Sequence, residues 1–493
     1  MTIKASGFVP ETGLIFERSE PGRQGVQFPS VDVPETDLPA EMRREALHLP
    51  EVSELEMVRH FTRLSQKNFA IDLGFYPLGS CTMKYNPKIN DAIANLAGFQ
   101  DMHPYQDPAT IQGALELMWE LQEWLGEIAG LPAVTLQPAA GAHGELTGAL
   151  IMRAYHESQG RPRQTILVPD SAHGTNPATA AMVGYNTKEL PTDANGNVDL
   201  NVLRELMSED VAGLMITNPS TLGVFEENII EVAEVVHAQG GLIYMDGANM
   251  NAMVGIARPG DFGMDILHYN LHKTMTVPHG GGGPGAGATA VREDLARFLP
   301  VPLVAKASDG SFYFDYDRPD TIGRVRAFYG NFNNMVRAFV YMRILGQEGL
   351  LDMSQTAVLN ANYIKEQLRG VYHLPIDRTC KHEVIFTSKW LKKKTSHLDH
   401  PVRTLDVAKR LLDYGIHAPT VYFPLTVEEC MLIEPTETES KQMLDDFVTV
   451  MKQIAQEAEE TPELITSAPH HAPITRLDEA RAARRPDLRW RPK

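Results

Sequence analysis

The chain has 493 residues and a formal net charge of −18 at pH 7, because 63 acidic side chains outnumber 45 basic ones. Acidic and basic residues are interspersed, which argues against nucleic acid and anionic membranes as partners. The cysteines, Cys81, Cys380 and Cys430, lie too far apart for a disulfide framework or a zinc pattern, so we expect no bound metal. No apolar run is long enough to span a bilayer, and the first residues lack the apolar core of a signal peptide. We therefore expect a cytoplasmic protein, with a mature mitochondrial protein as the alternative.

The pattern of the chain indicates four parts. The predicted parts are an extended N-terminal arm at 1–60, a large α/β domain at 61–345, a smaller α+β domain at 346–460 and a C-terminal tail at 461–493. The arm and the tail are rich in proline and charge with little periodicity. We expect the arm to become ordered by packing on a partner.

Periodicity predicts the main elements in chain order. Apolar residues from Thr110 to Gly130 form one face of a helix, and Gly130 is a suitable stop. From Val134 to Arg292, strands and helices alternate, which predicts a mostly parallel sheet covered by helices. A helix is expected at 333–345. In the smaller domain, helices such as 404–414 alternate with short strands such as 383–387.

The sequence Asn270-Leu271-His272-Lys273-Thr274 is the most informative motif, together with the glycine-rich run 280–285. A lysine directly after a histidine, close to a short apolar run, is typical of the lysine that forms a Schiff base with pyridoxal phosphate. Glycines let backbone amides approach a phosphate closely. The alternative is a surface lysine beside a flexible loop. We expect Lys273 to lie on the strand that follows Asp246.

Asp246 supports the cofactor interpretation independently. It ends the apolar run 241–245, which is typical of a buried parallel strand. Ligands of open α/β sheets lie outside the carboxyl ends of the strands. A carboxylate there can pair with the protonated pyridine nitrogen, so that the ring accepts electrons from a carbanion. The alternative is a turn or helix-capping aspartate.

Three further strand ends carry residues suited to the same ligand. The small residues Ala140, Gly141 and Ala142 stand between a short strand and a helix, where free N–H groups and the helix dipole favour a phosphate. His173 follows the strand at 165–168 and can stack on the ring and exchange protons near the reacting carbon. Thr217 follows another strand and offers a hydroxyl to the ring oxygen. An ordinary turn is the alternative at each of these places.

Several long motifs resemble the glycine cleavage system P-protein family. The matching segments are 77–84, 171–177, 272–274, 278–285 and 434–441, and the likeness spans about Asp72 to Lys441. In many organisms the P-protein is one chain of two similar halves. This chain has half that length and resembles the carboxyl-terminal half, which carries the lysine.

The resemblance implies the aspartate-aminotransferase-like fold, fold type I of the pyridoxal-phosphate enzymes. It implies pyridoxal phosphate bound covalently to Lys273, with Asn270 and His272 beside the cofactor. Glycine would be decarboxylated and its aminomethyl group transferred to the lipoyl arm of the H-protein. The implied partner is the lysine-lacking subunit 1, in an α2β2 assembly.

Two other functions stay open from the sequence. The first is a different pyridoxal-phosphate enzyme, such as an amino-acid decarboxylase or a cysteine desulfurase, which would need a mobile nucleophilic cysteine. The second is a non-catalytic subunit of the same complex. Retention of both Lys273 and Asp246 argues against the second.

Overall fold

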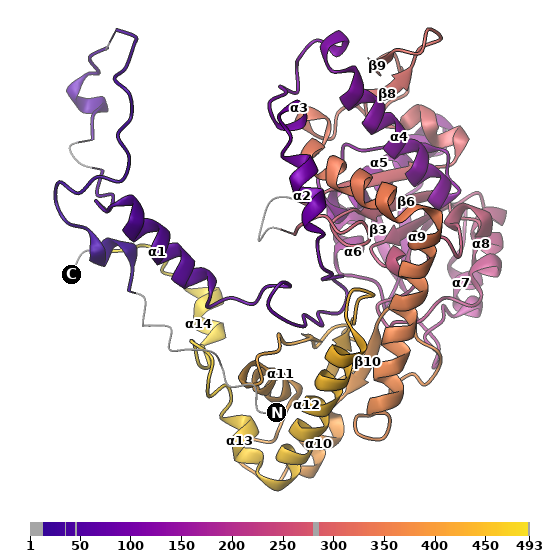
Figure 1. The fold of residues 1–493 in the computed structure, drawn as a ribbon. Coiled ribbons are helices and arrows are strands. Elements are labelled where there is room, and N and C mark those ends of the chain that lie inside the picture. Colours follow the sequence, from indigo (N-terminus) through magenta and orange to yellow (C-terminus); the bar gives the residue numbers. More distant parts are fainter. Residues whose placement is uncertain (1–12, 35, 45–46, 280–284, 492–493) are drawn as a thin grey trace. The chain divides into compact units, whose positions relative to one another are not determined.

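The computed structural model describes residues 13–34, 36–44, 47–279 and 285–491 (Figure 1). The described chain divides into two compact units, one of Phe75–His470 and one built from the two ends of the chain. The unit built from the two ends of the chain contains helices α1 (Glu54–Ser65) and α14 (Glu479–Arg484). Much of its remaining described backbone is irregular. The four-part division expected from the sequence stays a prediction.

A seven-stranded sheet forms the core of the unit Phe75–His470. Its strands are β1 (Ala133–Thr135), β2 (Thr165–Pro169), β3 (Asn186–Leu190), β4 (Val211–Thr217), β5 (Leu242–Gly247), β6 (Ile266–Asn270) and β7 (Gly287–Val291). Their order is β1-β7-β6-β5-β4-β2-β3, and β7 pairs antiparallel with both of its neighbours. The other pairs are parallel, so six strands run in one direction. The expected mostly parallel sheet is confirmed.

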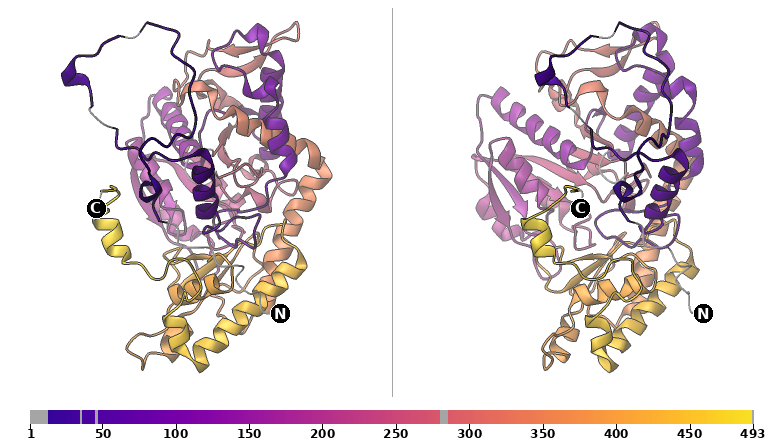
Figure 2. Two further views of the ribbon diagram at one scale, coloured as in Figure 1. Left: turned by 60° about the vertical axis from the view of Figure 1, so that its left-hand side comes forward. Right: turned by 90° about the vertical axis from the view of Figure 1, so that its left-hand side faces the viewer.

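Helices cover both faces of this sheet (Figure 2). The helices of the unit up to the end of the sheet are α2 (Lys88–Ala94), α3 (Ala97–Gln100), α4 (Gln112–Ala129), α5 (Gly141–Ser158), α6 (Thr175–Met182), α7 (Leu200–Leu206) and α8 (Ile229–Ala238). Alternate side chains of β5 enter different clusters: Tyr244 packs with α5 and α6, whereas Met245 packs with α4, α7 and α8. Because helices cover both faces of the sheet, the side chains of β5 on both faces are buried, which explains the continuous apolar run of this strand.

A second, smaller sheet lies toward the end of the unit. It contains β10 (Val384–Thr387), β12 (Cys430–Ile433) and β11 (Thr420–Val421) in that order, all antiparallel. Its helices are the end of α9 (Phe332–Leu368), α10 (Lys389–Lys394), α11 (Thr404–Asp413), α12 (Lys441–Glu460) and α13 (Pro462–Thr466). α12 runs beside α9 in Figures 1 and 2. A separate two-stranded sheet, β8 (Leu303–Lys306) and β9 (Phe312–Asp315), completes the unit.

The predicted elements are found close to their expected places, with one correction. α4 ends at Gly130, whose φ of 66° is left-handed, as a glycine stop allows. The helix expected at 333–345 is the first part of α9, which is interrupted at Gly346. Lys273, expected on a strand, lies in the turn just after β6 instead, because the backbone leaves the sheet at Asn270. Among the helices of the described residues, none is long and apolar enough to cross a membrane.

Candidate active site

Five parallel strand ends meet around one cavity of about 230 Å³. The strands are β1, β2, β4, β5 and β6, and the cavity lies at their carboxyl ends, where ligands of such sheets bind. Its lining includes nine residues that the sequence proposed for the site: Ala140, Gly141, Ala142, His173, Thr217, Asp246, Asn270, His272 and Lys273. The tertiary structure therefore brings these residues together around one cavity.

Lys273 is held at the edge of this cavity with a buried side chain. Only 9% of the residue is exposed, and its backbone N–H donates to the Asn270 carbonyl at 3.0 Å. The amine Nζ donates to the Ser80 carbonyl at 2.8 Å. His272 points its Nδ1 to the Ala286 carbonyl at 3.0 Å, and burial lowers its pKa to about 4. A neutral imidazole therefore stands beside the lysine at neutral pH.

Asp246, near the end of β5, is a buried carboxyl group with one close hydrogen bond and two longer contacts. The residue is 2% exposed, and its Oδ1 accepts the Ala248 N–H at 2.9 Å. Its other neighbours are more distant: His268 Nε2 and Asn176 Nδ2 both lie at 3.4 Å. A carboxylate taken out of water needs a cationic or hydrogen-bonding partner. Its position in the cavity wall makes it suited to a cationic group of a ligand.

The N-terminus of α5 forms another part of the wall. Gly141 is its first residue, and Ala140, which precedes it, provides no side-chain cap among the described residues. A Cβ at Gly141 would lie 2.2 Å from Asn270 Oδ1, so only glycine lets the helix begin this close to β6. The dipole of this 18-residue helix places positive potential at the cavity. This end of the helix is suited to an anionic group.

Two polar side chains from the ends of β2 and β4 complete the predicted set. His173 is exposed, and its Nδ1 accepts the Thr175 N–H at 3.2 Å. Thr217 is 5% exposed, yet its hydroxyl has no hydrogen-bond partner in the described part of the chain. A buried hydroxyl without a partner costs free energy unless a ligand supplies one. Thr217 therefore fits a place where a ligand atom binds.

Sequence reasoning missed several residues of the cavity, above all Ser80, Glu145 and His268. Burial and the charge of Asp246 raise the pKa of Glu145 to about 7, although Thr175 Oγ1 donates to it at 2.7 Å. Burial also lowers the pKa of His268, which contacts the Tyr244 hydroxyl and lies 3.0 Å from Asn270 Oδ1. A histidine inside the apolar strand β6 was the signal that could have identified it.

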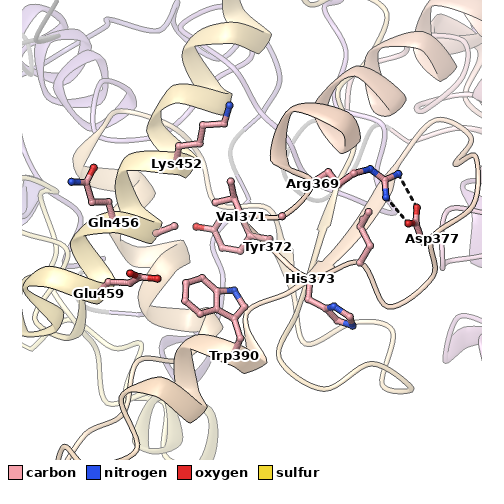
Figure 3. Close-up of a pocket in the computed structure, with 12 residues that line it drawn as sticks. Arg369, Val371, Tyr372, His373, Asp377, Trp390, Lys452, Gln456 and Glu459 are labelled. Carbon is pink, nitrogen blue, oxygen red and sulfur yellow. Dashed lines mark hydrogen bonds and ion pairs between the residues drawn. The ribbon is translucent and has the colours of Figure 1, made fainter.

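A larger cavity, of about 980 Å³, lies elsewhere between the end of α9, α10 and α12 (Figure 3). Its walls include Arg369 and Asp377, which pair with each other, and Trp390. Among the described residues, none of those proposed for the site lines it. The glycines 280–284, proposed for a phosphate site, lie outside the described residues.

Comparison with known proteins decides the family. A model of the glycine cleavage system P-protein matches residues 29–396, and a model of the glycine dehydrogenase C-terminal domain matches residues 353–472. The chain belongs to the glycine cleavage system P-protein family. A P-protein relative from Caldanaerobacter subterraneus subsp. tengcongensis, named "Probable glycine dehydrogenase (decarboxylating) subunit 2", is 56% identical over 97% of this chain and 98% of its own length. A relative of the same name from Halalkalibacterium halodurans is 57% identical over the same shares.

Solved structures agree on the fold. A glycine decarboxylase (P-protein) of the glycine cleavage system, in inhibitor-bound form, matches with a TM-score of 0.71 and 22% identity, covering 85% of this chain and 93% of that chain. A mutant of C-DES with glycine covalently linked to its PLP cofactor matches with a TM-score of 0.57 and 14% identity, covering 77% and 96%. The chain therefore has the aspartate-aminotransferase-like fold, fold type I of the pyridoxal-phosphate enzymes.

Proposed function

We propose that the chain is subunit 2 of a two-subunit P-protein, which decarboxylates glycine and transfers the aminomethyl group to the lipoyl arm of the H-protein. The observation that carries this proposal is the cavity in which Lys273 and Asp246 stand at the ends of neighbouring strands. The near-complete match to relatives named as subunit 2 supports the same assignment. A bacterial or archaeal cytoplasm is the proposed location.

The residues of the cavity suit pyridoxal phosphate. The amine of Lys273 would hold it covalently, and the buried carboxylate of Asp246 would pair with its pyridine nitrogen. The start of α5, at Ala140, Gly141 and Ala142, would bind its phosphate group. When bound, the cofactor supplies a π system that accepts the electrons left on glycine as carbon dioxide departs.

Other side chains would orient the bound groups and handle protons. The Thr217 hydroxyl, unpartnered in the part of the chain that is described, would donate to the cofactor ring oxygen. His173 would lie over the ring face as a proton acceptor, because partial desolvation of its exposed imidazole by the surrounding cavity lowers its pKa. Asn270 and His272 would line the cofactor from the lysine side.

The cysteine desulfurase alternative is less well supported. That chemistry needs a mobile, reactive thiolate. Cys430 is fully buried, and burial raises its thiol pKa to about 11. Cys380 is 4% exposed, and burial raises its pKa to about 12. Cys81 lies 3.4 Å from His279 Nε2, yet burial raises its pKa as well. These thiols remain protonated at neutral pH, which argues against a nucleophilic role.

An exchange assay tests the proposal. The purified chain, supplied with pyridoxal phosphate, partner subunit 1 and lipoylated H-protein, should exchange labelled bicarbonate into the carboxyl group of glycine. Lys273→Ala should abolish the exchange, because covalent catalysis loses its nucleophile. Omission of the H-protein serves as the control. Failure to exchange with every component present would contradict the proposal, as would unchanged exchange in Lys273→Ala.

Chemical trapping tests the attachment of the cofactor separately. Borohydride reduction of the protein with its cofactor, followed by peptide mapping, should place the pyridoxyl label on Lys273. Lys84 is the matched internal control, because it is also buried but its amine contacts Glu437 and Asn251 at 2.8 Å. A label on Lys84 would overturn the assignment.

A further inference from the structure

The segment that reaches Lys273 is anchored by the smaller sheet. The Gly79 N–H donates to the Leu432 carbonyl at 3.2 Å, and Thr420 Oγ1 donates to the Gly79 carbonyl at 2.7 Å. A Cβ at Gly79 would lie 2.5 Å from the Leu432 carbonyl oxygen, so a larger residue would push the segment off β12. These contacts fix the backbone just before Ser80, at the edge of the cavity.

The peptide groups of Ser80 join a buried glutamate to the lysine. The Ser80 N–H donates to Glu383 Oε2 at 2.6 Å, and the Ser80 carbonyl accepts Lys273 Nζ at 2.8 Å. Ser80 adopts a φ of 62°, in the left-handed region that serine rarely occupies. The bonds on its two sides compensate for this unfavourable backbone, and they aim the carbonyl at the amine.

Glu383 is built as a hydrogen-bond acceptor. It is fully buried just before β10, and its Oε1 has no hydrogen-bond partner among the described residues. Burial raises the pKa of Glu383 to about 8, so at neutral pH the side chain carries a proton. Glu383 therefore accepts the hydrogen bond of the Ser80 N–H as a neutral group, and a glutamine at this position should accept the same bond.

We infer that Glu383 is a positioning residue for Lys273. It holds the backbone of Ser80 in the conformation that lets the Ser80 carbonyl accept a hydrogen bond from the lysine amine. In this structure the free amine of Lys273 donates to the Ser80 carbonyl at 2.8 Å. Only the kinetic consequence rests on the proposed function, because the two hydrogen bonds belong to the chain itself.

Three variants separate positioning from stability. Glu383→Ala removes the acceptor, and Glu383→Gln keeps one. Glu226→Ala is the matched control, because Glu226 is also buried and its Oε2 accepts the backbone N–H of Val198 at the same distance, 2.6 Å. The control should lose comparable stability and leave Lys273 unaffected.

Two readouts need no catalytic activity. In Glu383→Ala, hydrogen exchange of the Ser80 amide should accelerate by about five- to tenfold, as expected for the loss of one buried hydrogen bond. Acylation of Lys273 by acetic anhydride in the cofactor-free protein, followed by peptide mapping, should also become faster. Glu383→Gln and Glu226→Ala should both keep the wild-type rates at these two positions.

The kinetic readout uses the complete system of chain, partner subunit, cofactor and H-protein. Glu383→Ala should lower kcat of the exchange by about tenfold while the KM for glycine changes little, and Glu383→Gln should restore it. If Glu383→Ala moved these readouts no further than Glu226→Ala, the inference would be wrong. A different outcome separates the two proposals. If Glu383→Ala changed the hydrogen exchange of the Ser80 amide and the acylation of Lys273, but the wild type did not exchange bicarbonate into glycine, the positioning role would stand and the proposed function would be wrong.

Discussion

At the scale of single residues, two buried carboxyl groups face the same cavity from different elements. Asp246 comes from the end of β5 and Glu145 from α5, and both are less than 5% exposed. Two like charges this close cannot both be stable without a cation, so one carboxyl keeps its proton more readily than the other. Burial and the nearby charge of Asp246 raise the pKa of Glu145 to about 7, so Glu145 holds a proton far more readily than an exposed glutamate does.

We predict that Asp246→Asn lowers turnover much more than stability. Asparagine keeps the shape of the side chain and an oxygen for the Ala248 N–H, so the melting temperature should change by only a few degrees. A neutral amide cannot stabilise a cationic ring, and a change of one pKa unit corresponds to about 1.4 kcal/mol, or tenfold. We expect kcat to fall by more than about tenfold in the exchange assay. Early melting with normal activity per folded molecule would show that Asp246 is structural.

Glu145 gives a prediction on pH. Its pKa is about 7 in the fold and 4.5 in its ordinary state, so the folded protein binds a proton that the unfolded chain releases between these values. The contribution of Glu145 to stability is complete below about pH 4.5, and it is lost as pH rises to about 7. The loss approaches about 3 kcal/mol.

Denaturant unfolding of the cofactor-free protein at pH 5 and pH 8 measures this effect. Wild type should lose stability relative to Glu145→Gln between the two pH values, because glutamine does not titrate. Glu189→Gln, on the exposed strand β3, is the control. A difference between wild type and Glu145→Gln that does not change with pH would contradict the prediction.

At the element scale, glycines let α5 approach the sheet. Gly144 and Gly148 lie one turn apart on α5. A Cβ at Gly144 would lie 2.8 Å from His268 Cβ, and a Cβ at Gly148 would lie 2.6 Å from the ring of Tyr244. The close approach holds the start of the helix against β5 and β6, and therefore at the cavity. The position of this proposed phosphate site thus depends on residues that do not line it.

We predict that Gly148→Ala destabilises the protein by about 1–3 kcal/mol, because the methyl group must displace the buried Tyr244 ring. Gly113→Ala, near the start of α4, is the matched control. Among the residues that are described, nothing lies within 4 Å of a Cβ at that position. The control should be neutral or stabilised by up to about 1 kcal/mol. Equal effects in the two variants, measured by chemical unfolding, would refute the role of Gly148.

At the scale of the whole molecule, the N-terminal part exposes large apolar side chains. Phe28 is 87% exposed, Met42 is 70% exposed and Leu49 is 68% exposed. Exposed apolar side chains that gather along one segment indicate a protein–protein contact. They support the proposed role of the N-terminal arm, which is to pack on subunit 1.

We predict that the chain alone is inactive or poorly active, and that subunit 1 converts it to an active α2β2 complex. Sedimentation with and without the partner should show the change in mass. Phe28→Ser should weaken this association, whereas Leu425→Ser, equally exposed at 89% but in the other unit, should not. A stable, fully active homodimer that needs only the H-protein would defeat the prediction.

The sequence by itself determined the sheet, the family resemblance and the nine residues proposed for the site. Each of these depends on local patterns, such as an apolar run that ends in Asp246 or a turn that opens α5, and parallel strands bring their ends to one edge. Lys273 was expected on a strand and lies in a turn, because the apolar pattern around β6 does not show where the backbone leaves the sheet.

Only the tertiary structure decided which distant residues support the lysine. The Ser80 carbonyl lies 193 positions from Lys273 in the chain, and Ser80 lies 303 positions from Glu383. No local periodicity relates residues at such separations, because their contact depends on how the smaller sheet packs against the segment before α2. The pKa of Glu145 has the same origin, since its burial and its proximity to Asp246 arise only when α5 packs on β5.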